Sequence, residues 1–141
     1  MAHIIVDGYN FIRRIPPFLE AEQEGLEQGR EALLMALEEY GAQNSYWITA
    51  VFDGCGRPGF EDFELSSKDR FAGIDVMFSA KGQSADVIIL GMVEKGAEDA
   101  QEMIVVTDDF ELRDEAAARG AYVKSALEFF NAMEEKRPIE Y

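Results

Sequence analysis

His3-Ile4-Ile5-Val6-Asp7-Gly8 is a short apolar run that ends in an acid and a glycine. The run and its turn signal predict a buried strand over residues 3–6. The same pattern returns twice, because Asp53-Gly54 follows the aromatic and β-branched run 46–52, and Asp108-Asp109 follows the run 103–107. Three strands, each followed by acids, therefore form the frame of the predicted fold.

Helical patterns occupy much of the sequence between these strands. Apolar side chains share one face of residues 25–40, and Gly41 stands where a helix stop is expected. Ser84 predicts the cap of a helix that runs to about Lys95, because its side-chain oxygen can accept from the first free amides. Two further strands, at 74–78 and 121–124, and two further helices, at 110–119 and from Ala126 to Met133, complete the pattern.

This order of elements predicts an α/β fold with a mostly parallel central sheet and helices on both faces. Right-handed crossovers place the carboxyl ends of the parallel strands at one edge, and ligands of such sheets bind outside that edge. The chain has 141 residues, of which 48% are hydrophobic and 29% are charged, so we expect a single domain over residues 1–141.

Composition excludes several classes of protein. The single cysteine, Cys55, excludes an internal disulfide framework and a cysteine zinc site. No apolar run approaches the roughly 18–20 residues that span a bilayer, so a cytoplasmic protein without membrane contact is expected. With 28 acidic residues against 13 basic ones, the net charge of −15 repels phosphate chains and argues against a generic nucleic-acid coat.

Acidic side chains stand at the ends of the predicted elements. Asp7, Asp53 and Asp109 follow strands, and Asp86 lies at the start of a helix. We expect Asp7, Asp86 and Asp109 to converge at one edge of the sheet, with Asp53 close by. Clustered like charges cost stability unless a cation neutralises them, and oxygen ligands suit Mg²⁺ or Mn²⁺ rather than zinc. A site of this kind supports phosphodiester hydrolysis.

Four motifs carry a resemblance, at residues 5–10, 51–54, 81–86 and 105–109. In order and spacing they resemble the NYN domain, and within it the YacP-like family of the PIN-like nuclease superfamily. The resemblance implies a PIN-like Rossmannoid three-layer sandwich. It also implies a divalent-metal-dependent endoribonuclease that hydrolyses phosphodiester bonds of RNA.

The resemblance also assigns residues to roles. It gives Asp7, Asn10, Asp86 and Asp109 as catalytic, and Asp7, Asp86, Asp109 and Asp53 as ligands of Mg²⁺ or Mn²⁺. Asp108 departs from the family, which often has a small serine there, and so adds charge at the site. The acidic pI of about 4.3 leaves room for a partner, such as the ribosome, to deliver mRNA as substrate.

Basic and polar residues near the acids are candidates for RNA contact. Arg13 and Arg14 follow the first motif and are the best candidates to contact phosphate. Lys81 either contacts phosphate or is a solvated loop lysine, and Thr107 either positions water or is an ordinary strand-end residue. Basic residues alternate with phenylalanines in the segment 57–71, which fits either a stacking surface for single-stranded RNA or anchors that pin the loop to the core.

Two alternatives compete with the nuclease. The first is a non-catalytic module of the same fold that binds RNA or the ribosome; the retained acids argue against it, because their repulsion would then serve no purpose. The second is a receiver-type phosphoacceptor domain, which acidic strand ends and Lys124 suggest. A receiver needs a pair of acids at the end of its first strand, where this chain has Val6-Asp7-Gly8.

Overall fold

The computed structural model describes residues 1–54, 73–80 and 82–141. Within them, five parallel strands form one sheet in the order β3-β2-β1-β4-β5. The strands are β1 (His3–Asp7), β2 (Trp47–Phe52), β3 (Ile74–Phe78), β4 (Met103–Val106) and β5 (Tyr122–Lys124). The predicted parallel sheet is therefore confirmed, and β1 lies at its centre.

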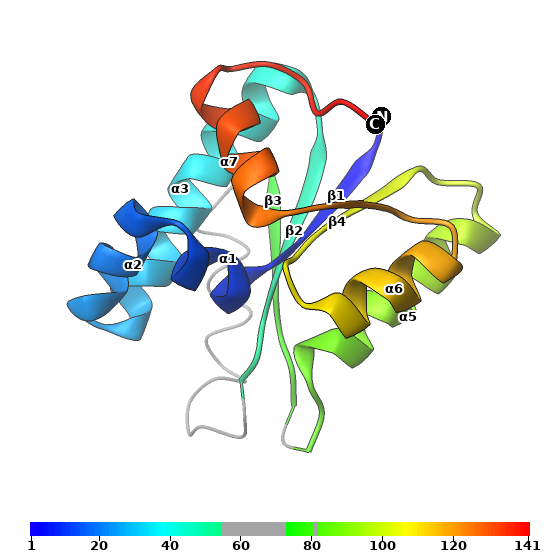
Figure 1. The fold of residues 1–141 in the computed structure, drawn as a ribbon, viewed down its shortest axis with the longest axis horizontal. Coiled ribbons are helices and arrows are strands. Elements are labelled where there is room, and N and C mark those ends of the chain that lie inside the picture. The colour runs from blue at the N-terminus through cyan, green and yellow to red at the C-terminus, as the bar shows by residue number, and fades with distance from the viewer. Residues whose placement is uncertain (55–72, 81) are drawn as a thin grey trace.

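Helices cover both faces of the sheet and make the predicted three layers (Figure 1). The helices α1, α3 and α7 pack on one face, with α2 against α3, and α5 and α6 pack on the other. Their bounds are α1 (Gly8–Arg14), α2 (Pro16–Gln23), α3 (Leu26–Asn44), α5 (Ala85–Glu98), α6 (Phe110–Ala118) and α7 (Ala126–Glu134).

Alternation along the strands divides the core between these two faces. Ile4 and Val6 of β1 belong to the cluster under α1, α3 and α7, whereas Ile5 belongs to the cluster under α5 and α6. All three side chains have no exposed surface. A strand with both faces covered reads as a continuous apolar run, which explains the sequence of β1.

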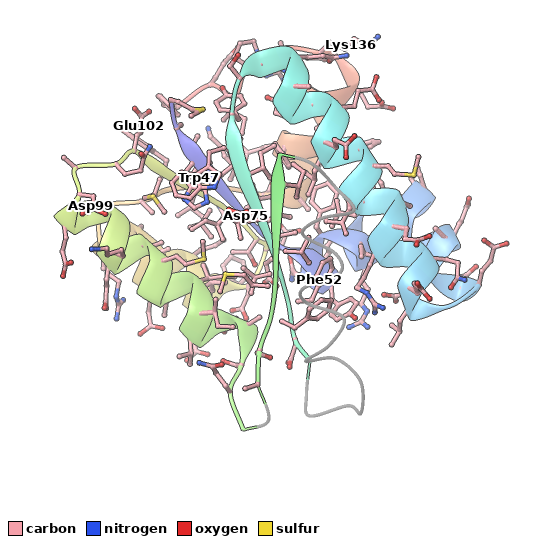
Figure 2. All side chains as sticks on the ribbon, turned by 180° about the vertical axis from the view of Figure 1, so that it is seen from behind. Trp47, Phe52, Asp75, Asp99, Glu102 and Lys136 are labelled. Atoms are coloured by element: carbon pink, nitrogen blue, oxygen red, sulfur yellow. The ribbon has the colours of Figure 1, made fainter. Side chains whose placement is uncertain are left out.

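The sheet ends at β3 on one side, and Figure 2 shows this edge with Trp47 at the start of β2 and Phe52 at its end. Trp47 stacks on the ring of His3, with centroids 3.6 Å apart. Its Nε1 donates to Asp75 Oδ2 on β3 at 2.9 Å. These contacts join β1, β2 and β3 near their amino-terminal ends, opposite the strand-end acids.

Two helices were not predicted from the sequence. Residues 8–14 form α1 and residues 16–23 form α2, so Arg13 and Arg14 lie in the last turn of α1. Proline begins α2, where its missing amide and fixed φ suit the first helical turn.

The expected helix stop at Gly41 was wrong. The helix α3 continues to Asn44, and Ser45 ends it with a left-handed φ of 58°. A Cβ at position 41 would lie 3.1 Å from Ile48 Cδ1 of β2. The glycine therefore serves close packing of helix on sheet rather than termination.

Lys81 and the basic-aromatic segment 57–71 lie outside the described residues. Among the residues that the structure does describe, no helix is both long and apolar enough to cross a bilayer.

Candidate active site

Asp7 lies where the central strand ends. Strand β1 pairs with β2 on one side and β4 on the other, so Asp7 stands between the carboxyl ends of both neighbours. Thr107 directly follows β4, and its hydroxyl donates to Asp7 Oδ2 at 2.9 Å. The sheet topology thus brings together two residues that are 100 positions apart in the sequence.

The surroundings of Asp7 raise its pKa to about 6. Burial is the main cause, and the charges of Asp86, Asp109 and Asp53 add to it, while the hydrogen bond from Thr107 acts in the opposite direction. The pKa of Asp86 is also raised, first by burial and then by Asp109 and other acids. Asp7 and Asp86 thus each lie within the electrostatic influence of Asp53 and Asp109.

Each of the partner acids is held by a defined local structure. Asp109 is the N-cap of α6, where its Oδ1 accepts from the amides of Glu111 and Leu112 at 3.0 and 3.3 Å. Asp53 follows β2 and accepts from the hydroxyl of Ser79 at 3.1 Å. Asp86 lies in the first turn of α5, which Ser84 caps as predicted. Two helix starts and one strand end therefore carry these three acids.

Among the described residues, these acids do not form a closed cage for a metal ion. Within residues 1–54, 73–80 and 82–141, no three His, Cys, Asp or Glu side chains are arranged to hold one metal ion. The donor chemistry nevertheless fits a hard cation, because Mg²⁺ typically takes one or two carboxylates and keeps several waters. A bound cation would also offset the repulsion between Asp7 and the neighbouring acids.

Asn10 and Asp108 form a second set of contacts beside the acids. Asn10 Oδ1 accepts from the backbone amide of Asp108 at 2.9 Å, so α1 fixes the turn that follows β4. The Asp108 carboxylate accepts from the amide of Ala126, at the start of α7, at 3.3 Å. Asp108 therefore links β4 to α7.

Two arginines face the same carboxylate. Arg14 Nε lies 3.8 Å from Asp108 Oδ2, and Arg113 Nη1 lies 4.0 Å from Oδ1. Arg113 also donates to the carbonyl of Thr107 at 3.4 Å. Arg13 instead pairs with Glu22 of α2, with its Nε 3.1 Å from Oε1. Arg14 and Arg113 thus flank the acidic edge, and sequence reasoning missed Arg113 because its place depends on how α6 packs.

Replacing Thr107 with valine is expected to lower the free energy of unfolding by about 1–3 kcal/mol. Thr107 is buried, and valine keeps its shape but removes the donor to Asp7 and the acceptor for the Asp109 amide. Loss of the donor also raises the pKa of Asp7 further, which NMR titration of the carboxyl group would measure. Thr107→Ser keeps the hydroxyl and is the matched control; equal effects of both substitutions would contradict this role.

A separate apolar cavity of about 360 Å³ lies near the amino-terminal ends of the strands. Its lining includes His3, Trp47 and Met103 from strand starts and Ile88 and Met92 from α5. None of the four edge aspartates lines it. This cavity is therefore separate from the strand-end acids.

A central parallel strand that ends in an acid, with further acids at neighbouring strand and helix ends, is the arrangement expected of an NYN domain, a class related to PIN-like nucleases. The YacP-like NYN domain matches residues 4–139, and the chain belongs to this family. The protein YacP of Bacillus subtilis (strain 168), described as uncharacterized, is 25% identical over 131 residues, which cover 93% of this chain and 74% of that protein.

Solved structures support the same assignment. The crystal structure of Rae1 (YacP) from Bacillus subtilis matches with a TM-score of 0.76 and 27% identity, over 96% of this chain and 75% of that one. A variant of that protein matches with a TM-score of 0.78 and 24% identity, over 96% and 77% of the two chains, and shows the same fold.

Proposed function

We propose that the protein is a divalent-metal-dependent endoribonuclease. The observation that carries the proposal is the buried carboxylate of Asp7 at the end of the central strand, whose pKa is raised to about 6 by burial first and then by the charges of Asp86, Asp109 and Asp53. Membership of a family related to PIN-like nucleases supports the same chemistry. A non-catalytic module would gain stability by losing these acids, since their repulsion opposes folding.

One or two of the carboxylates of Asp7, Asp86, Asp109 and Asp53 would hold Mg²⁺ or Mn²⁺, and water would complete its coordination. A bound cation of this kind supplies a water of lowered pKa and stabilises negative charge on the phosphate. Thr107 orients Asp7 through its hydroxyl, and Asn10 keeps the turn of Asp108 and Asp109 in place.

The flanking arginines give the site a route for the RNA backbone. Arg14 and Arg113 lie 3.8 and 4.0 Å from Asp108, and a phosphate oxygen would offer each guanidinium a closer charged acceptor. Arg13 would join them on leaving Glu22, and Lys81 stays a candidate for the same role. The rest of the surface is strongly acidic, so a partner that delivers the RNA, such as a cytoplasmic ribosome carrying mRNA, would offset long-range repulsion.

Incubation of the protein with RNA in EDTA, Mg²⁺ or Mn²⁺, with and without ribosomes, tests the proposal. We expect cleavage only with a cation, and a cation-induced rise in melting temperature that is smaller in Asp86→Asn. Asp99→Asn, which removes an exposed charge at the far end of α5, is the control and should keep both. RNA binding without cleavage under every condition would favour the non-catalytic module, and the absence of any cation effect would contradict the metal site.

A further inference from the structure

Phe110 is the most exposed aromatic side chain among the described residues for which exposure is given, with 82% of its surface free. It is the first residue of α6 and directly follows Asp109, the cap of that helix. The buried residues of α6 are Leu112 and Ala116, so the ring has no place in the core. Single exposed apolar residues are common on proteins, and only the position of this one gives it meaning.

A second apolar side chain stands beside the other acid. Val87, 56% exposed, directly follows Asp86 in the first turn of α5. Helices α5 and α6 pack side by side on the same face of the sheet (Figure 1). Apolar surface therefore accompanies both Asp86 and Asp109 at their helix starts, although the molecule as a whole is acidic.

The positively charged side chain of Arg113 lies one turn beyond Phe110 on the same helix. Residues three apart share a helix face, so Arg113 follows Phe110 along one side of α6. The guanidinium of Arg113 reaches back to the carbonyl of Thr107 at 3.4 Å and lies 4.0 Å from Asp108. An aromatic face and an arginine thus accompany the candidate active site, which is the pair of groups that single-stranded nucleic acid uses.

Resting on the proposed function, we propose that Phe110 stacks on an unpaired base next to the bond that is cleaved, and so makes the site select single-stranded RNA. A duplex keeps its base faces stacked and cannot offer one to the ring. The backbone would pass on the side of Arg14 and Arg113, because Glu111 and Glu115 place negative charge around Asp86.

Binding measurements separate stacking from general contact. The protein carries Asp7→Asn so that RNA stays intact, and a labelled single-stranded adenine oligonucleotide is titrated by fluorescence anisotropy. Phe110→Leu keeps apolar bulk but loses the ring, and we expect about tenfold weaker binding. Phe110→Trp should bind at least as well as the parent. Tyr141 is another exposed aromatic residue, and it stacks on Tyr122 at the start of β5, so Tyr141→Leu is the control and should bind as well as the parent.

An oligonucleotide series with one abasic position per strand locates the contact. One abasic position should abolish the difference between Phe110→Leu and the parent, because the ring then has no base to meet. Equal binding by Phe110→Leu and the parent, in a protein that cleaves RNA, would overturn the stacking and leave the nuclease intact. Binding of duplex RNA as tight as that of single strands would overturn the selectivity.

The outcome also distinguishes the two proposals. If the natural chain cleaves no RNA but Phe110→Leu weakens binding tenfold, the nuclease fails and the stacking surface stands as part of a binding module. If the protein neither binds nor cleaves RNA, with or without ribosomes, both fail.

Discussion

Asp7→Asn is expected to abolish RNA cleavage and, in metal-free buffer, to make the protein more stable. The Asp7 carboxylate lies at the end of the central strand, and the charges of three neighbouring acids help to raise its pKa. Asparagine keeps the size and one acceptor oxygen for Thr107, but it removes the charge that would hold a cation. We expect a loss of at least about a thousandfold in cleavage rate, since positioning and charge stabilisation fail together.

The stability gain follows from the raised pKa. A folded-state pKa of about 6 against an ordinary value of 3.8 means that the folded protein binds more protons than the unfolded chain between these pH values. Its stability therefore falls as pH rises through that window, by at most about 3 kcal/mol for a shift of this size. Solvent screening and a weaker hydrogen bond from Thr107 reduce the expected gain of the asparagine variant to about 1–2 kcal/mol at pH 7.

Urea unfolding from pH 4 to pH 8 measures this difference. The advantage of Asp7→Asn should be small near pH 4, grow towards pH 6 and then stay level. Burial lowers the pKa of His3 to about 4, so its titration adds an opposite slope, but it acts equally on both proteins and cancels. Asp99→Asn should show no such pH-dependent gain, and a lower stability of Asp7→Asn at pH 7 would mean that Asp7 is chiefly a structural residue.

Gly8→Ala is expected to lower the melting temperature by roughly 10 °C, which corresponds to about 3 kcal/mol. A Cβ at position 8 would lie 2.9 Å from Phe52 Cζ, and closer still to two other atoms of the same ring. Phe52 has no exposed surface and packs between Tyr9 and Phe78, so its ring cannot move aside without disturbing both. The start of α1 must therefore shift, and Asp7 shifts with it.

Gly91→Ala is the matched control for this substitution. It lies inside α5, where a Cβ would meet nothing within 4 Å, so helix propensity alone should raise stability by about 0.5–1 kcal/mol. Thermal unfolding followed by circular dichroism compares the two. A normal melting temperature for Gly8→Ala would contradict the tight packing of α1 on β2.

The strands and their acids were predictable because each strand is a short apolar run with a clear turn signal after it. Helices α1 and α2 were not, because Gly8-Tyr9-Asn10 and the prolines at 16 and 17 are typical of turns. The spacing of Phe11, Ile15 and Phe18 was the available signal, and all three lie in the core.

Contacts between distant segments were beyond sequence reasoning. The hydrogen bond from the Asp108 amide to Asn10 joins residues 98 apart, and Arg113 reaches Thr107 and Asp108 only because of the way α6 packs. Gly41 was wrongly predicted to end its helix, because the glycine is needed instead for the close packing of α3 against Ile48 of β2. Local patterns carry the elements, whereas the contacts that assemble them depend on packing.

The central place of β1 also determines when this protein can complete its site during synthesis. The first strand needs β4, and Asp7 needs Thr107, which follows it by 100 residues. A nascent chain that ends before Met103 has one side of β1 unpaired and lacks Asp109 altogether. Contacts so distant in sequence form late and slow the folding rate. We therefore expect the four acids to come together only when most of the polypeptide has left the ribosome that makes it.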